Sequence, residues 1–180
     1  MYGLVNKAIR ELVIETAGEE SWEQIAENVN HLEGDFVAMY PYEDKLTYDL
    51  VSETAKMLGK DENDILMIFG KYWINYTKKS RYGDLLDFDN QSFVEIIDSL
   101  DFLHDRIKDM MPDLNPPKFS SKQINSNRLE LTYESHRDGM MPMLHGLILG
   151  MGELYKLQLS FKVVKEMSES DRQAVVEISW

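Results

Sequence analysis

The pattern of apolar residues in this chain changes once, at a group of prolines about two-thirds of the way along its 180 residues. Before Pro112, apolar residues recur every three or four positions, which is the spacing of one buried helix face. After Pro116 and Pro117, whose rings cannot continue a helix, apolar and polar residues alternate as they do in strands. The chain is therefore expected to be α+β, with a helical part followed by a small antiparallel sheet that carries one helix.

The same patterns predict where the elements lie. Gly18 is expected to end the first helix, and Ser21 to cap a second helix that begins at Trp22. Gly83 marks a break between two later helices. The remaining helices are expected at about 44–58, 62–76, 91–111 and 138–155, and the strands at 118–123, 128–137, 157–166 and 173–180.

Composition excludes several classes of function. The net charge of −13, without a large cluster of Lys and Arg, makes nucleic acid and anionic membranes poor partners. The lack of cysteine excludes disulfides, thiolate catalysis, cysteine zinc sites, iron–sulfur clusters and covalent heme attachment through a C-x-x-C-H motif. No stretch approaches the roughly 20 apolar residues of a membrane span, and the pattern of the N-terminal segment indicates a core helix rather than a signal peptide. A cytoplasmic protein is the simplest interpretation.

One expected strand carries a group of hydrogen-bond donors. Side chains on a strand repeat every second residue, so Tyr133, Ser135 and Arg137 would share one face over roughly 13 Å. Two hydroxyls and a guanidinium together suit carboxylates, because Arg binds them in a bidentate manner and keeps its charge. The alternative, on this motif alone, is an exposed strand face with no binding role.

A histidine falls within the buried stripe of the helix expected at 91–111. The stripe consists of Ile96, Leu100, His104, Ile107 and Met111. A neutral imidazole in an apolar wall is a sound axial ligand for heme iron. The alternative is a core histidine that bonds a backbone carbonyl. Thirteen residues later, the rigid ring of Pro117 could press against a flat macrocycle.

The other three histidines are weaker candidates for a ligand. His31 lies in a polar turn, and His136 alternates away from the face of Tyr133 and is expected to be solvated. His145, in the last long helix, is the only serious rival to His104.

Together these features resemble the H-NOX family, the heme–nitric oxide/oxygen binding domains that include the heme domain of soluble guanylate cyclase. The likeness covers essentially the whole chain. It rests on the opening Met1-Tyr2-Gly3-Leu4-Val5-Asn6, the segment Phe69-Gly70-Lys71-Tyr72-Trp73, His104, Pro117, the triplet Tyr133, Ser135 and Arg137, and Gly146 in the following helix.

The resemblance implies a particular cofactor and its binding residues. It implies non-covalent heme b with His104 as proximal ligand, propionates held by Tyr133, Ser135 and Arg137, and a porphyrin distorted by Pro117. It also implies one domain over residues 1–180, with a helical part at about 1–62, a heme-binding part at about 63–180, and the heme between the two.

The resemblance also bears on which gas is bound. Oxygen-binding members carry a tyrosine three residues before the glycine that matches Gly146, and this chain has Met143 there, which has no proton to donate to bound O2. The expected protein therefore senses NO, binds CO and excludes O2. Val5 and Leu147 are expected in the same distal wall. Trp73 either directs its indole N–H into that pocket or is a core aromatic.

The expected mechanism is that NO weakens or breaks the bond between iron and His104, so that the helical part pivots against the sheet. Because no catalytic module follows Trp180, the resemblance implies a bacterial, stand-alone regulator that acts on a separate histidine kinase or cyclic-di-GMP enzyme (diguanylate cyclase or phosphodiesterase) and is not itself an enzyme. Two alternatives are a heme enzyme, such as a peroxidase or NO dioxygenase, and a heme-free module that binds another carboxylate.

Overall fold

The computed structural model describes residues 1–30, 35–80 and 87–180, so the break expected at Gly83 and the turn at His31 lie outside the described residues. Within these residues the α+β class is confirmed. The helices are α1 (Gly3–Ala17), α2 (Glu19–Asn28), α3 (Asp44–Leu58), α4 (Glu62–Lys79), α5 (Phe93–Met110) and α6 (Met141–Tyr155). The strands are β1 (Lys118–Asn125), β2 (Arg128–Glu134), β3 (Ser160–Lys165) and β4 (Gln173–Ser179).

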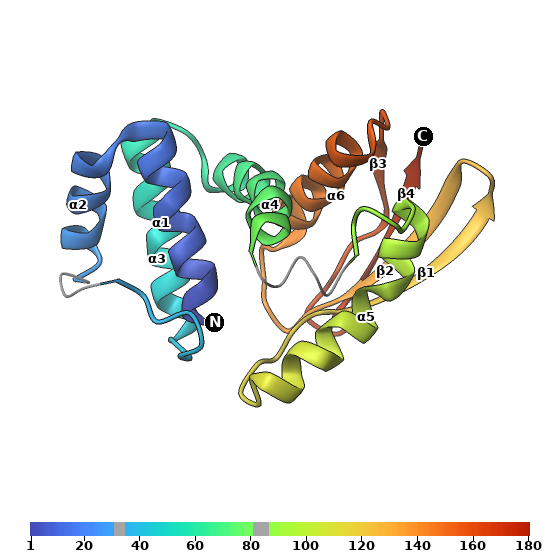
Figure 1. Cartoon of the computed structure of the whole chain (residues 1–180), viewed down its shortest axis with the longest axis horizontal. Helices are drawn as coiled ribbons and strands as arrows, with labels where there is room; N and C mark the ends of the chain where they lie inside the picture. The colour runs from blue at the N-terminus through green and yellow to red at the C-terminus, as the bar shows by residue number, and fades with distance from the viewer. Residues whose placement is uncertain (31–34, 81–86) are drawn as a thin grey trace.

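The elements are arranged in two groups with a helix pair between them. In Figure 1, α1, α2 and α3 form a group at one end, the sheet lies at the other end, and α4 and α6 lie between them. α5 runs beside the sheet on the side of β1. None of the described helices is both long enough and apolar enough to cross a membrane.

The boundary between α1 and α2 corrects one prediction. Gly18 ends α1 as expected, with a φ of 88° that favours glycine, but α2 begins directly after it at Glu19. Ser21 therefore lies inside the helix, where its hydroxyl donates to the carbonyl oxygen of Ala17 at 2.9 Å. The first turn of α2 is stabilised instead by the acidic Glu19 and Glu20, whose charges favour a helix N-terminus.

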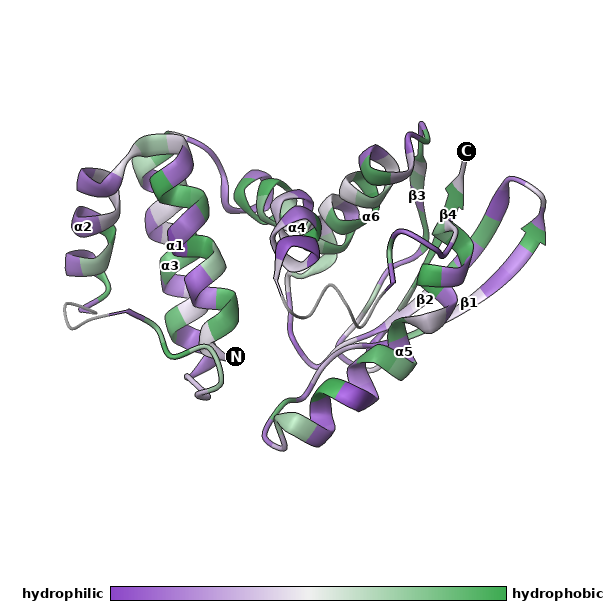
Figure 2. Ribbon diagram, viewed as in Figure 1, coloured by the Kyte–Doolittle hydropathy of each residue, from purple (hydrophilic) through white to green (hydrophobic). Residues whose placement is uncertain are grey.

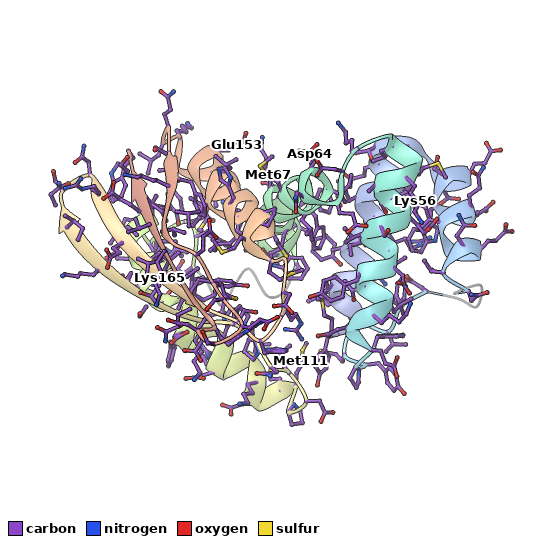
Figure 3. All side chains as sticks on the ribbon, turned by 180° about the vertical axis from the view of Figure 1, so that it is seen from behind. Lys56, Asp64, Met67, Met111, Glu153 and Lys165 are labelled. Carbon is purple, nitrogen blue, oxygen red and sulfur yellow. The ribbon has the colours of Figure 1, made fainter. Side chains whose placement is uncertain are left out.

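α4 and α6 cross with their backbones in contact. A Cβ atom on Gly146 would lie 2.0 Å from the carbonyl oxygen of Met67, and one on Gly70 would lie 2.2 Å from that of Met143. Only glycine fits at these two positions, so any side chain would force the helices apart. Figure 2 shows α6 as hydrophobic over most of its length, as expected for a helix buried on several sides. Figure 3 shows the two helices side by side, with Met67 on α4 and Glu153 on α6.

The antiparallel sheet has the order β1-β2-β4-β3 and buries one face. Alternate residues of its two central strands are buried and pair across the strands: Leu129 with Ile178, Leu131 with Val176, and Tyr133 with Ala174. The α6 helix starts at Met141 rather than Asp138, and β3 starts at Ser160 rather than 157. Before β3 the chain must first turn at Lys156, whose φ is 55°.

The end of β2 corrects a second prediction. The strand stops at Glu134 rather than at Arg137, because its partner β4 starts at Gln173, the residue opposite Glu134. Ser135 and Arg137 therefore lie on a turn beyond the strand, and regular strand alternation does not position them.

Candidate functional site

A cavity of about 270 Å³ lies between the helices and the sheet. A water molecule takes up about 30 Å³, so this space is far larger than an ordinary packing gap. Its lining is largely apolar and comes from α1, α4, α5, α6 and the buried face of the sheet. The residues expected as a buried stripe of α5, which are Ile96, Leu100, His104, Ile107 and Met111, all line it. Figure 3 shows Met111 at the end of α5, on the side of the α1–α3 group.

In the ring of His104, Nδ1 has a hydrogen-bond partner, whereas Nε2 has none among the described residues. Its Nδ1 lies 3.0 Å from the carbonyl oxygen of Pro117, which can only accept a hydrogen bond. Nδ1 therefore carries the proton, and the lone pair of neutral imidazole is on Nε2. Burial lowers the pKa of His104, although the Pro117 bond and the nearby carboxylates of Asp101 and Asp105 partly oppose this. The arrangement is that of an oriented neutral nitrogen ligand.

The helix that carries His104 is attached to β1 by its acidic side chains. The carboxylate of Asp101 accepts the backbone N–H of Phe119 at 2.6 Å, and Asp98 accepts the hydroxyl of Ser121. The Phe119 ring lies 5.6 Å from the ring of His104. Sequence reasoning missed Asp101, because nothing in the pattern indicates that an acidic residue on an exposed helix position bonds a strand N–H.

Tyr133, Ser135 and Arg137 are brought together at one end of the cavity, although only Tyr133 is in the strand. Tyr133 and Ser135 are buried, with 5% and 4% of their surface exposed. The Ser135 hydroxyl accepts the backbone N–H of Arg137 at 3.1 Å, which folds the turn back towards the strand. Three residues with donor groups thus line the same cavity within five positions of the sequence.

The Arg137 side chain is held by a residue that sequence reasoning missed. Its Nε and Nη2 donate to the carboxylate of Asp44 at 2.7 and 3.3 Å, and its Nη1 donates to the carbonyl of Asn115 at 2.9 Å. Burial pushes the pKa of Asp44 up, but bonds from Arg137 and the Met1 amino group outweigh it and hold that pKa below its usual value. Asp44 begins α3, so this ion pair ties the helical group to the sheet side.

The α4–α6 side of the cavity is almost entirely apolar. Met143 and Leu147 of α6 and Trp73 of α4 line it, and Val5 of α1 lines the same cavity. The hydroxyl of Thr77 also lies here but donates to the carbonyl of Trp73 at 2.8 Å. Among the described lining residues of α4 and α6, this leaves the indole N–H of Trp73 as the one donor without an assigned bond.

The rival histidines lie elsewhere. His145 stacks on Phe161 of β3 with ring centroids 4.4 Å apart and is not among the residues that line the cavity. His136 is exposed, as expected. Within the described parts of the chain, no group of three or more His, Cys, Asp or Glu side chains could hold a bare metal ion.

The residues present fit a heme. Heme is a flat apolar group with two carboxylates at one edge, and it requires only one protein nitrogen on its iron. The cavity offers apolar walls, the Nε2 of His104 on one wall, and the donors of Tyr133, Ser135 and Arg137 at one end.

Comparisons with known proteins point the same way. The family model described as haem-NO-binding matches residues 2–163. Soluble guanylate cyclase gcy-33 of Caenorhabditis elegans is 23% identical over 167 residues, which is 92% of this chain and 18% of that protein. Soluble guanylate cyclase gcy-35 of the same organism is 27% identical over 94% of this chain and 25% of its own length. The chain thus spans about a quarter or less of these relatives.

Solved structures share the fold. An H-NOX protein from S. oneidensis in its Fe(II)NO state superposes with a TM-score of 0.88 at 17% identity, covering 99% of this chain and 98% of that one. A mutant of the T. tengcongensis H-NOX protein gives a TM-score of 0.87 at 19% identity, over 99% and 97% of the two chains. Because the family model matches most of the sequence, the chain belongs to the haem-NO-binding (H-NOX) family, whose members are heme-based gas-sensing domains.

Proposed function

We propose that this chain binds heme b non-covalently through His104 and senses nitric oxide. The observation that carries the proposal is the free Nε2 of His104, held at the wall of an apolar cavity by the bond from Nδ1 to Pro117. When bound, ferrous heme would supply an iron that binds NO, and His104 would hold that iron through an Nε2 bond that NO would weaken or break. One domain over residues 1–180, with a helical part at about 1–62 and a heme-binding part at about 63–180, belongs to the same proposal.

The polar end of the cavity would hold the heme carboxylates. Three donors close together in the sequence line this cavity: the hydroxyls of Tyr133 and Ser135 and the guanidinium of Arg137. Arg137 would share its donors between Asp44 and a propionate. Pro117, which also lines the cavity, would press its ring against the macrocycle while its carbonyl orients His104.

The apolar side would select the gas. O2 bound to iron gains negative charge and depends on a nearby donor, whereas NO and CO depend on one far less. The side chains of Met143, Leu147 and Val5 offer no such donor, which supports a sensor that binds NO and CO and excludes O2. Among the described residues that line this side, Trp73 alone carries an indole N–H.

The output would be a change of shape read by another protein. Once its Nε2 is released, His104 remains attached to α5 and Pro117, so α5 and the turn before β1 would shift together. We propose that a cytoplasmic histidine kinase or cyclic-di-GMP enzyme of a bacterium prefers one of the two shapes, because a ligand shifts an equilibrium only through differential affinity. The chain itself would perform no catalysis.

The test is an absorption and stopped-flow series on purified protein. Reconstituted ferrous protein should show an intense Soret band that shifts on addition of NO and of CO and does not shift in air-saturated buffer. The same series on His145→Gln should match wild type, because that ring stacks outside the cavity. Protein that stays colourless with added hemin would contradict heme binding, and tight reversible O2 binding would contradict the proposed selectivity.

A further inference from the structure

The turn that carries Ser135 and Arg137 is attached to a second arginine, Arg172, just before β4. The Nε of Arg172 donates to the carbonyl oxygen of Ser135 at 3.0 Å. In return, the backbone N–H of Ser135 donates to the carbonyl oxygen of Arg172 at 3.2 Å. Ser135 is thus bonded to one residue through both of its backbone groups, 37 positions away in sequence.

Arg172 also holds the far end of the same turn. Its Nη1 lies 2.7 Å from the carboxylate of Asp138. The carbonyl oxygen of Asp138 accepts the hydroxyl of Tyr48 on α3 at 3.1 Å. Ser135 and Asp138 are therefore both fixed by one guanidinium, and Arg137 lies between them.

The segment that presents Arg172 is itself well fixed. Ser168 and Asp171 exchange backbone hydrogen bonds of 2.8 and 3.2 Å across the turn between β3 and β4. Asp171 is also bonded at 2.6 Å by Lys165, which is labelled in Figure 3. A side chain that starts from such a turn and ends on two acceptors has little freedom left.

The positive charge of Arg172 acts on Tyr133, which lines the cavity. The Nη2 of Arg172 is buried and has no hydrogen-bond partner among the described residues, and its ion-pair partner Asp138 is exposed to water, which screens that pair. Burial raises the pKa of the Tyr133 hydroxyl, and the positive charges of Arg137 and Arg172 partly oppose that rise.

We propose that Arg172 is a positioning residue for carboxylate recognition: it fixes the turn so that Ser135 and Arg137 converge on the two carboxylates of the ligand. The inference rests on the proposed heme function. A positioning role and a purely structural role of Arg172 predict different effects of removing its side chain on ligand binding. Its loss should weaken the binding of a porphyrin with free carboxylates more than that of the same porphyrin with its carboxylates esterified.

The test compares hemin with hemin dimethyl ester, titrated into wild type and Arg172→Gln. Wild type should bind hemin more tightly than the diester. In Arg172→Gln the affinity for hemin should fall about tenfold, as expected for a charge-assisted contact, while affinity for the diester changes little. Arg128→Gln is the matched control, because Arg128 lies at the opposite end of β2, pairs with Glu177 at 3.6 Å, and likewise has a buried nitrogen without a partner among the described residues.

Arg172→Lys is a second variant for the same titrations, to be used if Arg172→Gln does not fold. An ammonium group can keep the ion pair with Asp138 but cannot also supply the fixed second bond to Ser135, so it should lose part of the preference for hemin. Two results would overturn the inference while leaving heme binding intact. One is an equal loss of affinity for hemin and for its diester, and the other is a preference for hemin over the diester that stays as large as in wild type in both Arg172 variants. If wild type binds neither porphyrin, the proposed function fails and this inference with it.

Discussion

The two sides of the cavity are built in opposite ways. On the α5–β1 side, single polar contacts set the geometry: Pro117 orients the ring of His104, and Asp101 bonds the N–H of Phe119. On the α4–α6 side, backbone meets backbone at Gly70 and Gly146, and the lining is apolar. The first side offers a nitrogen ligand on His104, whereas the second offers apolar side chains and, among its described residues, one unassigned donor in the indole N–H of Trp73. Under the proposed function, heme affinity would depend mainly on the α5–β1 side and gas selectivity on the α4–α6 side.

His104→Ala should have the largest effect, because it removes the imidazole nitrogen that lies free on the cavity wall. Heme retention should fall by more than the roughly 10–100-fold that removing a partner of a ligand costs. Hemin titration and the ferrous spectrum measure this, and added imidazole should restore the spectrum. A ferrous His104→Ala spectrum identical to wild type would remove the basis for contrasting the two sides.

Met143→Tyr tests the apolar side by placing a hydroxyl donor on it. The donor should raise affinity for O2 by about tenfold or more, since a hydrogen bond to a charged acceptor contributes about 1.5–3 kcal/mol. O2 titration of the ferrous protein is the measurement. Met143→Phe has a similar ring without the hydroxyl and should leave O2 excluded. Equal O2 binding by both variants would show that the space in the cavity, rather than hydrogen bonding, controls O2 affinity.

Asp44→Asn removes the carboxylate charge of Asp44, which pairs with Arg137 on the sheet side and with the Met1 amino group. Its loss should lower the free energy of unfolding by about 1 kcal/mol at neutral pH, as for a partly exposed pair. The folded pKa of Asp44 is lowered, so its contribution is present above the unfolded pKa of about 3.9 and is lost as pH falls through the folded pKa. Urea unfolding at pH 7 and below pH 4 should therefore show a gap between variant and wild type that closes on acidification.

The control for this ion pair is Asp49→Asn, which breaks the exposed pair with Lys45 on one helix. That change should cost only a few tenths of a kcal/mol. If Asp44→Asn costs no more than the control, or keeps its full deficit in acid, the Asp44–Arg137 pair does not hold the two parts together.

Thr77→Val should have the smallest effect. The Thr77 hydroxyl already donates to the carbonyl of Trp73 within α4, so it is not available to a gas in the cavity. Replacement by an apolar side chain of the same shape should change the unfolding free energy by less than about 1 kcal/mol and leave the responses to NO, CO and O2 unchanged. An altered response to any of the three gases would show that the Thr77 hydroxyl does act as a donor in the cavity.

Much of the site could be predicted because its residues share a local period. The stripe that places His104 with Ile96 and Leu100 follows from helix geometry alone, and all three line the cavity. The prediction that the strand extends to Arg137 was wrong because it also relied on a local period. The alternation of a strand holds only while a partner strand continues, and β4 starts opposite Glu134. Ser135 and Arg137 still reach the site, through a turn that alternation does not describe.

By itself, the sequence determined the α+β class, most of the helices and strands, and the sides of them that are apolar, because each depends on backbone geometry over a few residues. Only the tertiary structure decided the polar connections, such as Arg137 with Asp44, 93 positions apart, and Arg172 with Ser135. Burial of apolar surface is non-directional and tolerates many partners, so it leaves a periodic trace in the chain. A hydrogen bond or ion pair requires two particular atoms to meet at about 3 Å, and that depends on how whole elements pack.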